Sequence, residues 1–201
     1  MFTLLSFVSS KTQMIDVSFW DDIVDYNKVK ESNISTVIVR VAYGTKKPDS
    51  MFESNILNAS AAGFKIGVYT YGLASTVSEA EEEADYVLKL IEPYKDKISL
   101  CVAYDVEDSV MNVGKQKVAS MVIQFANKVR EKGYTPWLYS NYNWANNFIN
   151  MTSIDSNDIQ FWIAQYSSEC TYAGKYVAWQ YTGSGKVPGM PNDDCDISWL
   201  M

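Results

Sequence analysis

ISLCVAYDVE, residues 98–107 of this 201-residue chain, is an apolar strand that runs directly into two carboxylates, Asp105 and Glu107. Successive strand side chains point to opposite faces and each residue adds roughly 3.3 Å, so the two acids share a face about 6.6 Å apart. Carboxylates this close carry out glycoside hydrolysis, in which one donates a proton to the leaving oxygen and the other stabilises positive charge. A solvated acidic turn or a hard-cation site would have the same pattern. The strand alone leaves all three interpretations open.

Short apolar runs alternate with helical segments along the rest of the chain, which is typical of an α/β fold with a mainly parallel sheet. Strands are expected at residues 14–17, 36–42, 65–71, 98–105, 135–139, 160–165, 176–181 and 196–199. Helices are expected at residues 51–62, 78–91 and 115–132, and the segments between strands shorten after Thr135. The sequence therefore predicts a modified TIM-like (β/α) barrel with eight strands and fewer helices in its C-terminal half.

The second expected helix begins with a capping signal. Ser78 is the expected N-cap, and Glu81 follows three residues later, the spacing of a capping box. Glu79, Glu82 and Glu83 add negative charge near the positive end of the helix dipole. We therefore interpret this acidic cluster as structural.

The amino-acid composition excludes several kinds of catalytic site and of binding partner. The chain has no histidine, which excludes Ser-His-Asp and Cys-His nucleophiles and zinc sites that need imidazole. With 17 basic and 24 acidic residues, its net charge of −7 argues against nucleic acid or an anionic membrane as the partner. The 14 tyrosines and 6 tryptophans suit either an aromatic core or stacking on sugar rings. We expect one domain, a monomer, with no cofactor and no metal.

The cysteines, the first 13 residues and three sequons give expectations about disulfide formation and secretion. Cys101 is expected to be buried and inert in its strand, whereas a disulfide between Cys170 and Cys195 is favoured. Residues 1–13 hold a short apolar run followed by polar residues, which we interpret as a signal-peptide remnant or an N-terminal extension before a single catalytic domain at 14–201. Sequons at three asparagines are compatible with a secretory route, namely Asn33, Asn58 and Asn150.

Polar residues follow several of the expected strands, where the active sites of parallel barrels gather. Asp16 closes the first strand, Asp105 and Glu107 follow the fourth, and Asp196 opens the eighth. The first and eighth strands become neighbours when the barrel closes, so four carboxylates are expected to face one mouth. Four carboxylates held this close repel one another and lower stability, so such a cluster is expected where the acids have a function.

At this point the chain resembles the muramidases of glycoside hydrolase family 25, the fold of many phage and bacterial lysozymes. The resemblance covers residues 14–199. Its elements, in chain order, are IDVS (15–18), VIVR (37–40), YGT (43–45), GVYTY (67–71), YDVED (104–108), WLYS (137–140), WIAQY (162–166), WQYT (179–182), GKVPG (185–189) and CDIS (195–198). Their order across one domain is far more specific than a lone Asp-x-Glu.

The resemblance implies hydrolysis of the β-1,4 bond between N-acetylmuramic acid and N-acetylglucosamine in peptidoglycan, with retention of configuration. It implies Glu107 as general acid, with its pKa raised by the other acids, and an ionised Asp105 that orients the 2-acetamido group to attack the anomeric carbon. Asp16 and Asp196 complete the catalytic set by positioning the sugar. The implied substrate contacts are Arg40, Tyr69, Tyr71, Tyr139, Gln165 and Trp179.

Some features depart from the family. Ser198 stands where the family often has asparagine, and Cys195 replaces a common apolar residue. With no appended wall-binding module expected, affinity would come from the cleft alone. The acidic pI of about 4.6 lacks the attraction of cationic lysozymes for bacterial walls, so we expect a digestive or defensive role at mildly acidic pH, secreted or in a digestive or phagosomal compartment.

Three alternative functions fit the sequence less well. Chitinases with related acetamido chemistry carry an extended Asp-rich strand motif, whereas Val102, Ala103 and Tyr104 precede Asp105 here. A glycan-binding barrel without catalysis is disfavoured because all four acids are present. A calcium-binding structural protein would use an acidic run that lacks alternate ligand spacing, namely Asp193, Asp194 and Asp196.

Overall fold

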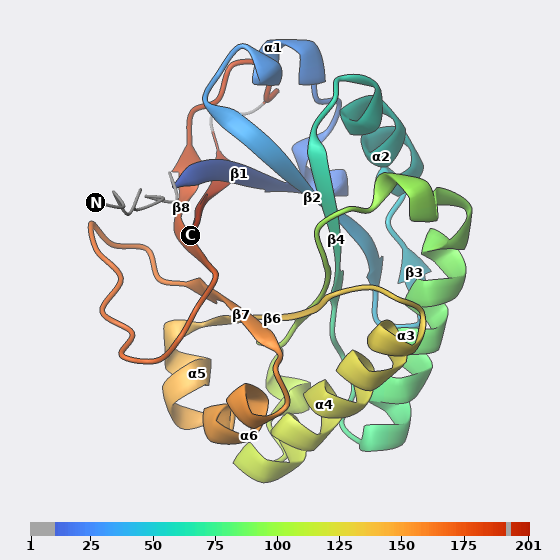
Figure 1. Cartoon of the computed structure of the whole chain (residues 1–201), viewed down its shortest axis with the longest axis vertical. Helices are drawn as coiled ribbons and strands as arrows, with labels where there is room; N and C mark the ends of the chain where they lie inside the picture. Colours follow the sequence, from blue (N-terminus) through green and yellow to red (C-terminus); the bar gives the residue numbers. More distant parts are fainter. Residues whose placement is uncertain (1–10, 192–193) are drawn as a thin grey trace, which may run out of the picture.

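The computed structural model describes residues 11–191 and 194–201, and its strands close into a barrel (Figure 1). The strand order is β1-β9-β8-β7-β6-β5-β4-β2-β3, and a further pairing of β1 with β2 closes the ring. The barrel strands are β1 (Thr12–Val17), β2 (Ile34–Tyr43), β4 (Lys65–Tyr71), β5 (Val102–Asp105), β6 (Pro136–Asn141), β7 (Gln160–Ala164), β8 (Ala178–Gly185) and β9 (Cys195–Leu200). β3 (Lys47–Pro48) pairs only with the end of β2. The expected eight-stranded α/β barrel is confirmed.

The last barrel strand runs against its neighbours. β9 is antiparallel to both β8 and β1, whereas the other barrel pairs are parallel. Asp196, near the start of β9, is thereby paired with Asp16, near the end of β1. In a fully parallel barrel, the start of the last strand would lie at the opposite end from the active-site mouth. The reversed strand is therefore what brings Asp196 to that mouth.

Helices cover the two halves of the barrel unequally, as expected (Figure 1). The longer ones are α2 (Phe52–Ala61), α3 (Val77–Ile91) and α4 (Lys115–Glu131). The shorter elements are α1 (Tyr26–Lys30), α5 (Tyr142–Asn147), α6 (Met151–Ser156) and the 3-10 turns η1 (Phe19–Asp21), η2 (Glu92–Lys97) and η3 (Ser109–Met111). No helix lies between β7 and β8. Within the described ranges, no helix is long and apolar enough to cross a bilayer.

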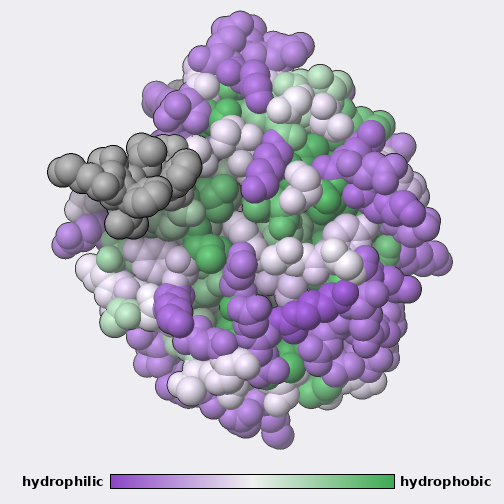
Figure 2. Space-filling view, in the orientation of Figure 1, coloured by the Kyte–Doolittle hydropathy of each residue, from purple (hydrophilic) through white to green (hydrophobic). Residues whose placement is uncertain are grey.

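Strand alternation divides the buried side chains into two shells. The barrel interior is filled by Met14, Ile38, Cys101, Ala103, Trp137, Tyr139, Trp162, Ala164 and Ala178. A larger outer shell packs the other strand faces against the helices. Hydrophilic residues gather around the periphery, while hydrophobic ones are seen further in over the strands (Figure 2). Ser198, the departure from the family pattern, is buried and accepts a hydrogen bond from the indole Nε1 of Trp162 at 3.0 Å.

The start of α3 differs from the sequence prediction. Thr76, in extended conformation, is the N-cap and accepts a hydrogen bond from the backbone N–H of Glu79 at 3.2 Å. Ser78 lies inside the first turn, so the predicted Ser78–Glu81 capping box is wrong. Glu83 is buried and accepts hydrogen bonds from the Tyr104 hydroxyl at 2.6 Å and the Leu73 N–H at 2.9 Å. This carboxyl therefore ties α3 to β5, the strand that ends at the acid pair.

The predicted disulfide is also wrong, because all three cysteines are free. Cys195 is buried in β9, where its neighbours are outer-shell apolar residues, while Cys170 lies half-buried in the β7–β8 connection. Cys101 is buried, as predicted. Of the predicted N-terminal extension, residues 1–10 lie outside the described residues, whereas β1 begins at Thr12 and Gln13 donates a hydrogen bond to the Tyr181 hydroxyl.

The position of the α3 cap can be tested with two matched alanine variants. Thr76→Ala removes an N-cap oxygen and should lower the free energy of unfolding by about 1 kcal/mol. Ser78→Ala lies within the helix and should change it by less than about 0.5 kcal/mol. Urea unfolding of both variants measures the difference. A larger loss for Ser78→Ala than for Thr76→Ala would contradict this assignment.

Candidate active site

A cavity of about 670 Å³ opens where the parallel strands end. Six acids line it, namely Asp16, Asp21, Asp105, Glu107, Asp194 and Asp196. Six aromatic residues join them, namely Trp20, Tyr69, Tyr71, Tyr139, Trp162 and Tyr166. Ser18, Gln180 and Gly183 complete the lining with Arg40, the one basic residue among the described lining residues. This is an acidic cavity with aromatic walls, a composition that suits a hydroxyl-rich ligand.

The four acids predicted from the sequence meet in this cavity. Asp16 comes from β1, Asp105 ends β5, Glu107 follows two residues later, and Asp196 comes from β9. The Val106 N–H still bonds the Tyr139 carbonyl at 2.9 Å, so the chain continues along β6 beyond the end of β5 and holds Glu107 at the mouth. The side-chain Nδ2 of Asn141 donates to Glu107 Oε2 at 3.1 Å. The acid pair is thus fixed by backbone and side-chain bonds.

Asp16 is held by a buried amide that the sequence analysis did not select. Gln180 Nε2 donates to Asp16 Oδ2 at 2.9 Å, while its Oε1 accepts from the hydroxyls of Tyr139 at 2.8 Å and Tyr166 at 3.0 Å. The Asp16 carboxylate fixes the amide orientation, because when ionised it can only accept and so faces Nε2, which leaves the carbonyl oxygen to accept the two hydroxyls. Burial, followed by the charge of Asp196, raises the pKa of Asp16 well above its ordinary value. The bond from Gln180 opposes this shift.

Both members of the acid pair are pushed toward their protonated forms. Burial raises the pKa of Glu107, and the charge of Asp108 adds to this, while the bond from Asn141 opposes it. Burial and the charge of Glu107 raise the pKa of Asp105 well above its ordinary value, against the opposing charge of Arg40. Burial, more than repulsion among the acids, is thus the leading cause for Glu107. Asp105 is less readily ionised than the sequence analysis expected.

One buried oxygen of Asp105 is left without a partner. Its Oδ1 makes no hydrogen bond to the residues that the structure describes. A buried acceptor without a donor costs roughly 1–3 kcal/mol, and such atoms call for an explanation. Because this oxygen belongs to a residue that lines the cavity, a donor on a bound ligand can satisfy it.

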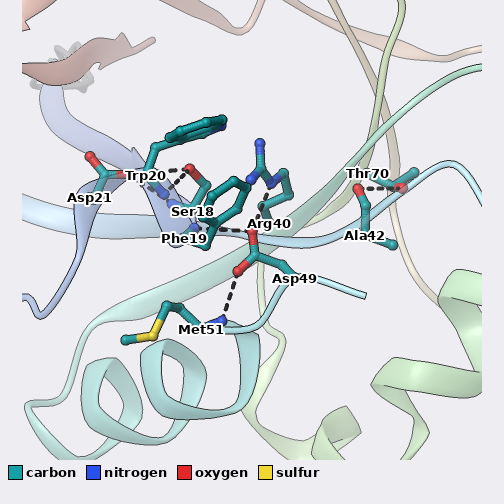
Figure 3. Close-up of polar contacts among 9 residues, drawn as sticks. All are labelled: Ser18, Phe19, Trp20, Asp21, Arg40, Ala42, Asp49, Met51 and Thr70. Atoms are coloured by element: carbon teal, nitrogen blue, oxygen red, sulfur yellow. Dashed lines mark hydrogen bonds and ion pairs between the residues drawn. The ribbon is translucent and has the colours of Figure 1, made fainter. Parts of the chain in front are cut away.

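Arg40 and Asp49 form a buried ion pair behind one wall of the cavity (Figure 3). Arg40 Nε donates to Asp49 Oδ2 at 2.8 Å, and the same carboxyl accepts the backbone N–H groups of Phe19 at 3.0 Å and Met51 at 2.9 Å. The Arg40 guanidinium also lies over the Phe19 ring, 5.0 Å from its centroid. Asp49 therefore joins β2, the start of α2 and the turn η1. It follows no predicted barrel strand, so the search of strand ends missed it.

Four of the six predicted substrate contacts line the cavity, namely Arg40, Tyr69, Tyr71 and Tyr139. Gln165 and Trp179 lie away from it. Trp179 points to the outer shell and donates from its indole Nε1 to the Gln165 carbonyl at 2.8 Å, while the Gln165 side chain bonds Thr171. Strand alternation gives the reason, because Ala178 and Gln180 occupy the inner face of β8 and Trp179 the outer one. Applying that alternation to the sequence would have selected Gln180 instead.

No group of three or more histidine, cysteine, aspartate or glutamate side chains is arranged to hold a metal ion within residues 11–191 and 194–201. Of the acidic run weighed as a calcium site, Asp193 lies outside the described residues. Asp194 is exposed at the cavity, and Asp196 accepts from the Tyr166 hydroxyl at 3.5 Å.

Comparison with known sequences assigns the family. The profile of glycosyl hydrolases family 25 matches residues 15–190, most of the barrel. The chain belongs to this family. The family 25 assignment agrees with the resemblance drawn from the strand motifs and with the closed barrel.

Individual relatives support the same assignment. The chain is 31% identical over 178 residues to the autolytic lysozyme of Clostridium acetobutylicum, which covers 88% of this chain and 52% of that protein. The modular autolysin LytC from Streptococcus pneumoniae, solved with a synthetic peptidoglycan ligand, shares the fold with a TM-score of 0.85 at 24% identity, covering 95% of this chain and 47% of that one. GHIP, a family 25 virulence factor of Streptococcus pneumoniae that participates in host cell invasion, has a TM-score of 0.78 at 26% identity, covering 94% and 87%. The family 25 chain thus spans about half the length of the first two proteins.

The burial of Asp196 among other acids predicts a pH-dependent gain in stability when its carboxyl group is neutralised. Burial and the charge of Asp21 raise the pKa of Asp196 from 3.8 to about 6. The folded state therefore binds this proton more tightly than the unfolded state, and the carboxyl group destabilises the fold only when it is ionised. The loss of folding free energy is absent below about pH 4 and complete above about pH 6. Asp196→Asn should raise the free energy of unfolding by about 1–3 kcal/mol at pH 7 and by little at pH 4, as measured by urea unfolding.

Asp25→Asn provides the control, because Asp25 is an exposed helix N-cap outside the cavity and asparagine is an equally good cap. It should show no gain that grows with pH. An equal effect of Asp196→Asn at both pH values would contradict this account.

Proposed function

We propose that this chain is a peptidoglycan muramidase that hydrolyses the β-1,4 bond between N-acetylmuramic acid and N-acetylglucosamine with retention of configuration. The observation that carries the proposal is the meeting of Glu107, Asp105, Asp16 and Asp196 in one cavity, with burial raising the pKa of Glu107. Membership of family 25 and similarity to an autolytic lysozyme support peptidoglycan as the substrate.

Glu107 is the proposed general acid. A group that protonates a glycosidic oxygen must hold its proton at the working pH, and burial favours this form. The hydrogen bond from Asn141 engages Oε2 and so orients the carboxyl plane toward the cavity. Proton donation to the leaving oxygen lets the bond to the anomeric carbon break without expelling an alkoxide.

Asp105 is the proposed orienting group. Its unpartnered Oδ1 can accept the N–H of the substrate's 2-acetamido group, and this bond would turn the acetamido carbonyl oxygen toward the anomeric carbon. Attack by that oxygen forms an oxazolinium-like intermediate on one face of the sugar. Water then opens this intermediate from the opposite face and gives a proton to the Glu107 carboxylate left by the first step, so that the acid is restored and two inversions retain the configuration.

The remaining polar groups position the sugar. Asp16 is oriented by Gln180 and so presents a fixed acceptor to a sugar hydroxyl, and Asp196 lies beside it with Oδ1 3.5 Å from the Tyr166 hydroxyl. The phenol of Tyr69 has a pKa raised well above its ordinary value by burial and by the charge of Asp16, which keeps it a hydrogen-bond donor. Arg40, already fixed through Nε by Asp49, supplies the cation among these acids.

A Glu107→Gln variant tests the role of the acid. The amide cannot donate the required proton, so release of reducing ends from purified cell wall should fall by about 10²–10⁴-fold while the variant still binds wall. Asp25→Asn should retain the wild-type rate. If Glu107→Gln cleaves wall as fast as the wild type does, Glu107 is not the acid. Chitin in a parallel assay distinguishes a chitinase-like activity, and wild-type binding of wall without cleavage would favour a glycan-binding barrel.

The proposed acid also predicts the alkaline side of the pH profile. Only protonated Glu107 is active, so the rate should fall as pH rises through its raised pKa, above the ordinary value of 4.5. Asn141→Ser removes the amide donor that lowers this pKa but keeps an oxygen to cap α5, so the alkaline limb should move to higher pH. Wall lysis at constant ionic strength measures both profiles.

A wild-type rate that climbs toward alkaline pH would contradict this assignment. It would also count against the proposed digestive or defensive role at mildly acidic pH, in a secreted or phagosomal setting.

A further inference from the structure

We infer that Trp20 is a stacking platform for a pyranose ring of the glycan strand at the rim of the cavity, an inference that rests on the proposed function. The indole is 72% exposed and lines the cavity. The chain's five other tryptophans are buried or half-buried, namely Trp137, Trp144, Trp162, Trp179 and Trp199. A large apolar ring left open beside a polar cavity is a recurrent feature of ligand-binding surfaces.

The turn that carries Trp20 is held by its own hydrogen bonds (Figure 3). In η1, the Ser18 N–H donates to Asp21 Oδ2 at 2.8 Å, and the Trp20 N–H donates to Ser18 Oγ at 3.2 Å. These reciprocal caps satisfy backbone donors that would otherwise need water. The indole is therefore displayed from a defined turn directly after the strand that carries Asp16.

The Arg40–Asp49 pair supports the same turn from behind. Asp49 accepts the Phe19 N–H, and the Phe19 ring contacts both the Arg40 guanidinium and the indole of Trp20. The Phe19 and Trp20 ring centroids are 4.2 Å apart with an interplanar angle of 34°. Phe19 thus backs one face of the indole, and a ligand can cover the exposed face without reordering the turn. Such preorganisation reduces the entropy lost on binding.

The surroundings specify the chemistry of the occupant. Asp21 adjoins Trp20 in the chain and lines the same cavity, together with the catalytic acids. An anionic group held directly against these carboxylates would be repelled, and a purely apolar ligand would leave them without donors. A pyranose ring fits both demands, because its C–H face can stack on the indole while its hydroxyls donate to carboxylates. Since Trp20 is only four residues after Asp16, this ring would be a near neighbour of the sugar at the cleaved bond.

Steady-state kinetics on soluble peptidoglycan glycan chains test the platform. Trp20→Ala should raise KM by about ten-fold and change kcat by less than about two-fold. The reason is that the indole stacks equally on the sugar in the bound substrate and in the transition state. Trp20→Phe should restore most of the affinity. Ile23→Ala is the matched control, since Ile23 is 76% exposed in the same loop but does not line the cavity, and its KM should be that of the wild type. An unchanged KM for Trp20→Ala would overturn the inference.

Fluorescence quenching gives a readout that does not depend on turnover. In full-length Glu107→Gln, a tetrasaccharide of alternating N-acetylglucosamine and N-acetylmuramic acid should protect the exposed Trp20 from acrylamide, and Trp20→Phe should abolish that protection. Binding without protection would overturn the inference. If the ligand protects Trp20 but the wild-type enzyme does not cleave wall, the platform is supported and the muramidase proposal is rejected. If the wild-type enzyme cleaves wall but Trp20→Ala leaves KM unchanged, the muramidase proposal is supported and the platform is rejected.

Discussion

The architecture depends on how the barrel closes at β1. This strand pairs with β2 in parallel and with β9 in antiparallel orientation, so both of its edges are satisfied by backbone hydrogen bonds. The reversed direction of β9 turns its first residues toward the mouth at which the parallel strands end. Asp16 and Asp196 thereby become paired neighbours, and the cavity acquires an acidic wall opposite β5.

That closure concentrates charge where burial makes charge unfavourable. The pKa values of Asp16, Asp105, Asp196 and Glu107 are all raised, with burial as the leading cause. The neighbouring bonds offset only part of this, through Gln180 at Asp16 and Asn141 at Glu107. Ionised, these buried acids lower the stability of the fold, and such perturbed groups are frequent at functional sites. The support lies around the cavity, where Asp49 collects three hydrogen bonds and Glu83 connects α3 to β5.

Strand positions were readable from the sequence because each barrel strand is a short apolar run bounded by polar residues, and the local pattern is strong. The cap of α3 was placed two residues late, because both Thr76 and Ser78 can cap and only the backbone conformation at Thr76 distinguishes them. Trp179 was taken for a sugar contact because its residue type suits stacking, although the alternation along β8 turns it outward. Trp20 was overlooked for the opposite reason, since nothing local reveals that an aromatic residue after β1 stays exposed.

The sequence by itself determined the available reactive groups and the family: an Asp-x-Glu pair after an apolar strand, two further acids at strand ends, no histidine, and the ordered motifs of family 25. Those features are local or compositional, so they can be read without coordinates. The tertiary structure alone decided the direction of β9, the burial that raises the carboxyl pKa values, and the contacts of Gln180, Asp49 and Trp20. The pairing of β9 with β1, the Gln180–Asp16 bond and the Asp49–Phe19 bond join residues far apart in the chain, and their proximity exists only in the folded barrel.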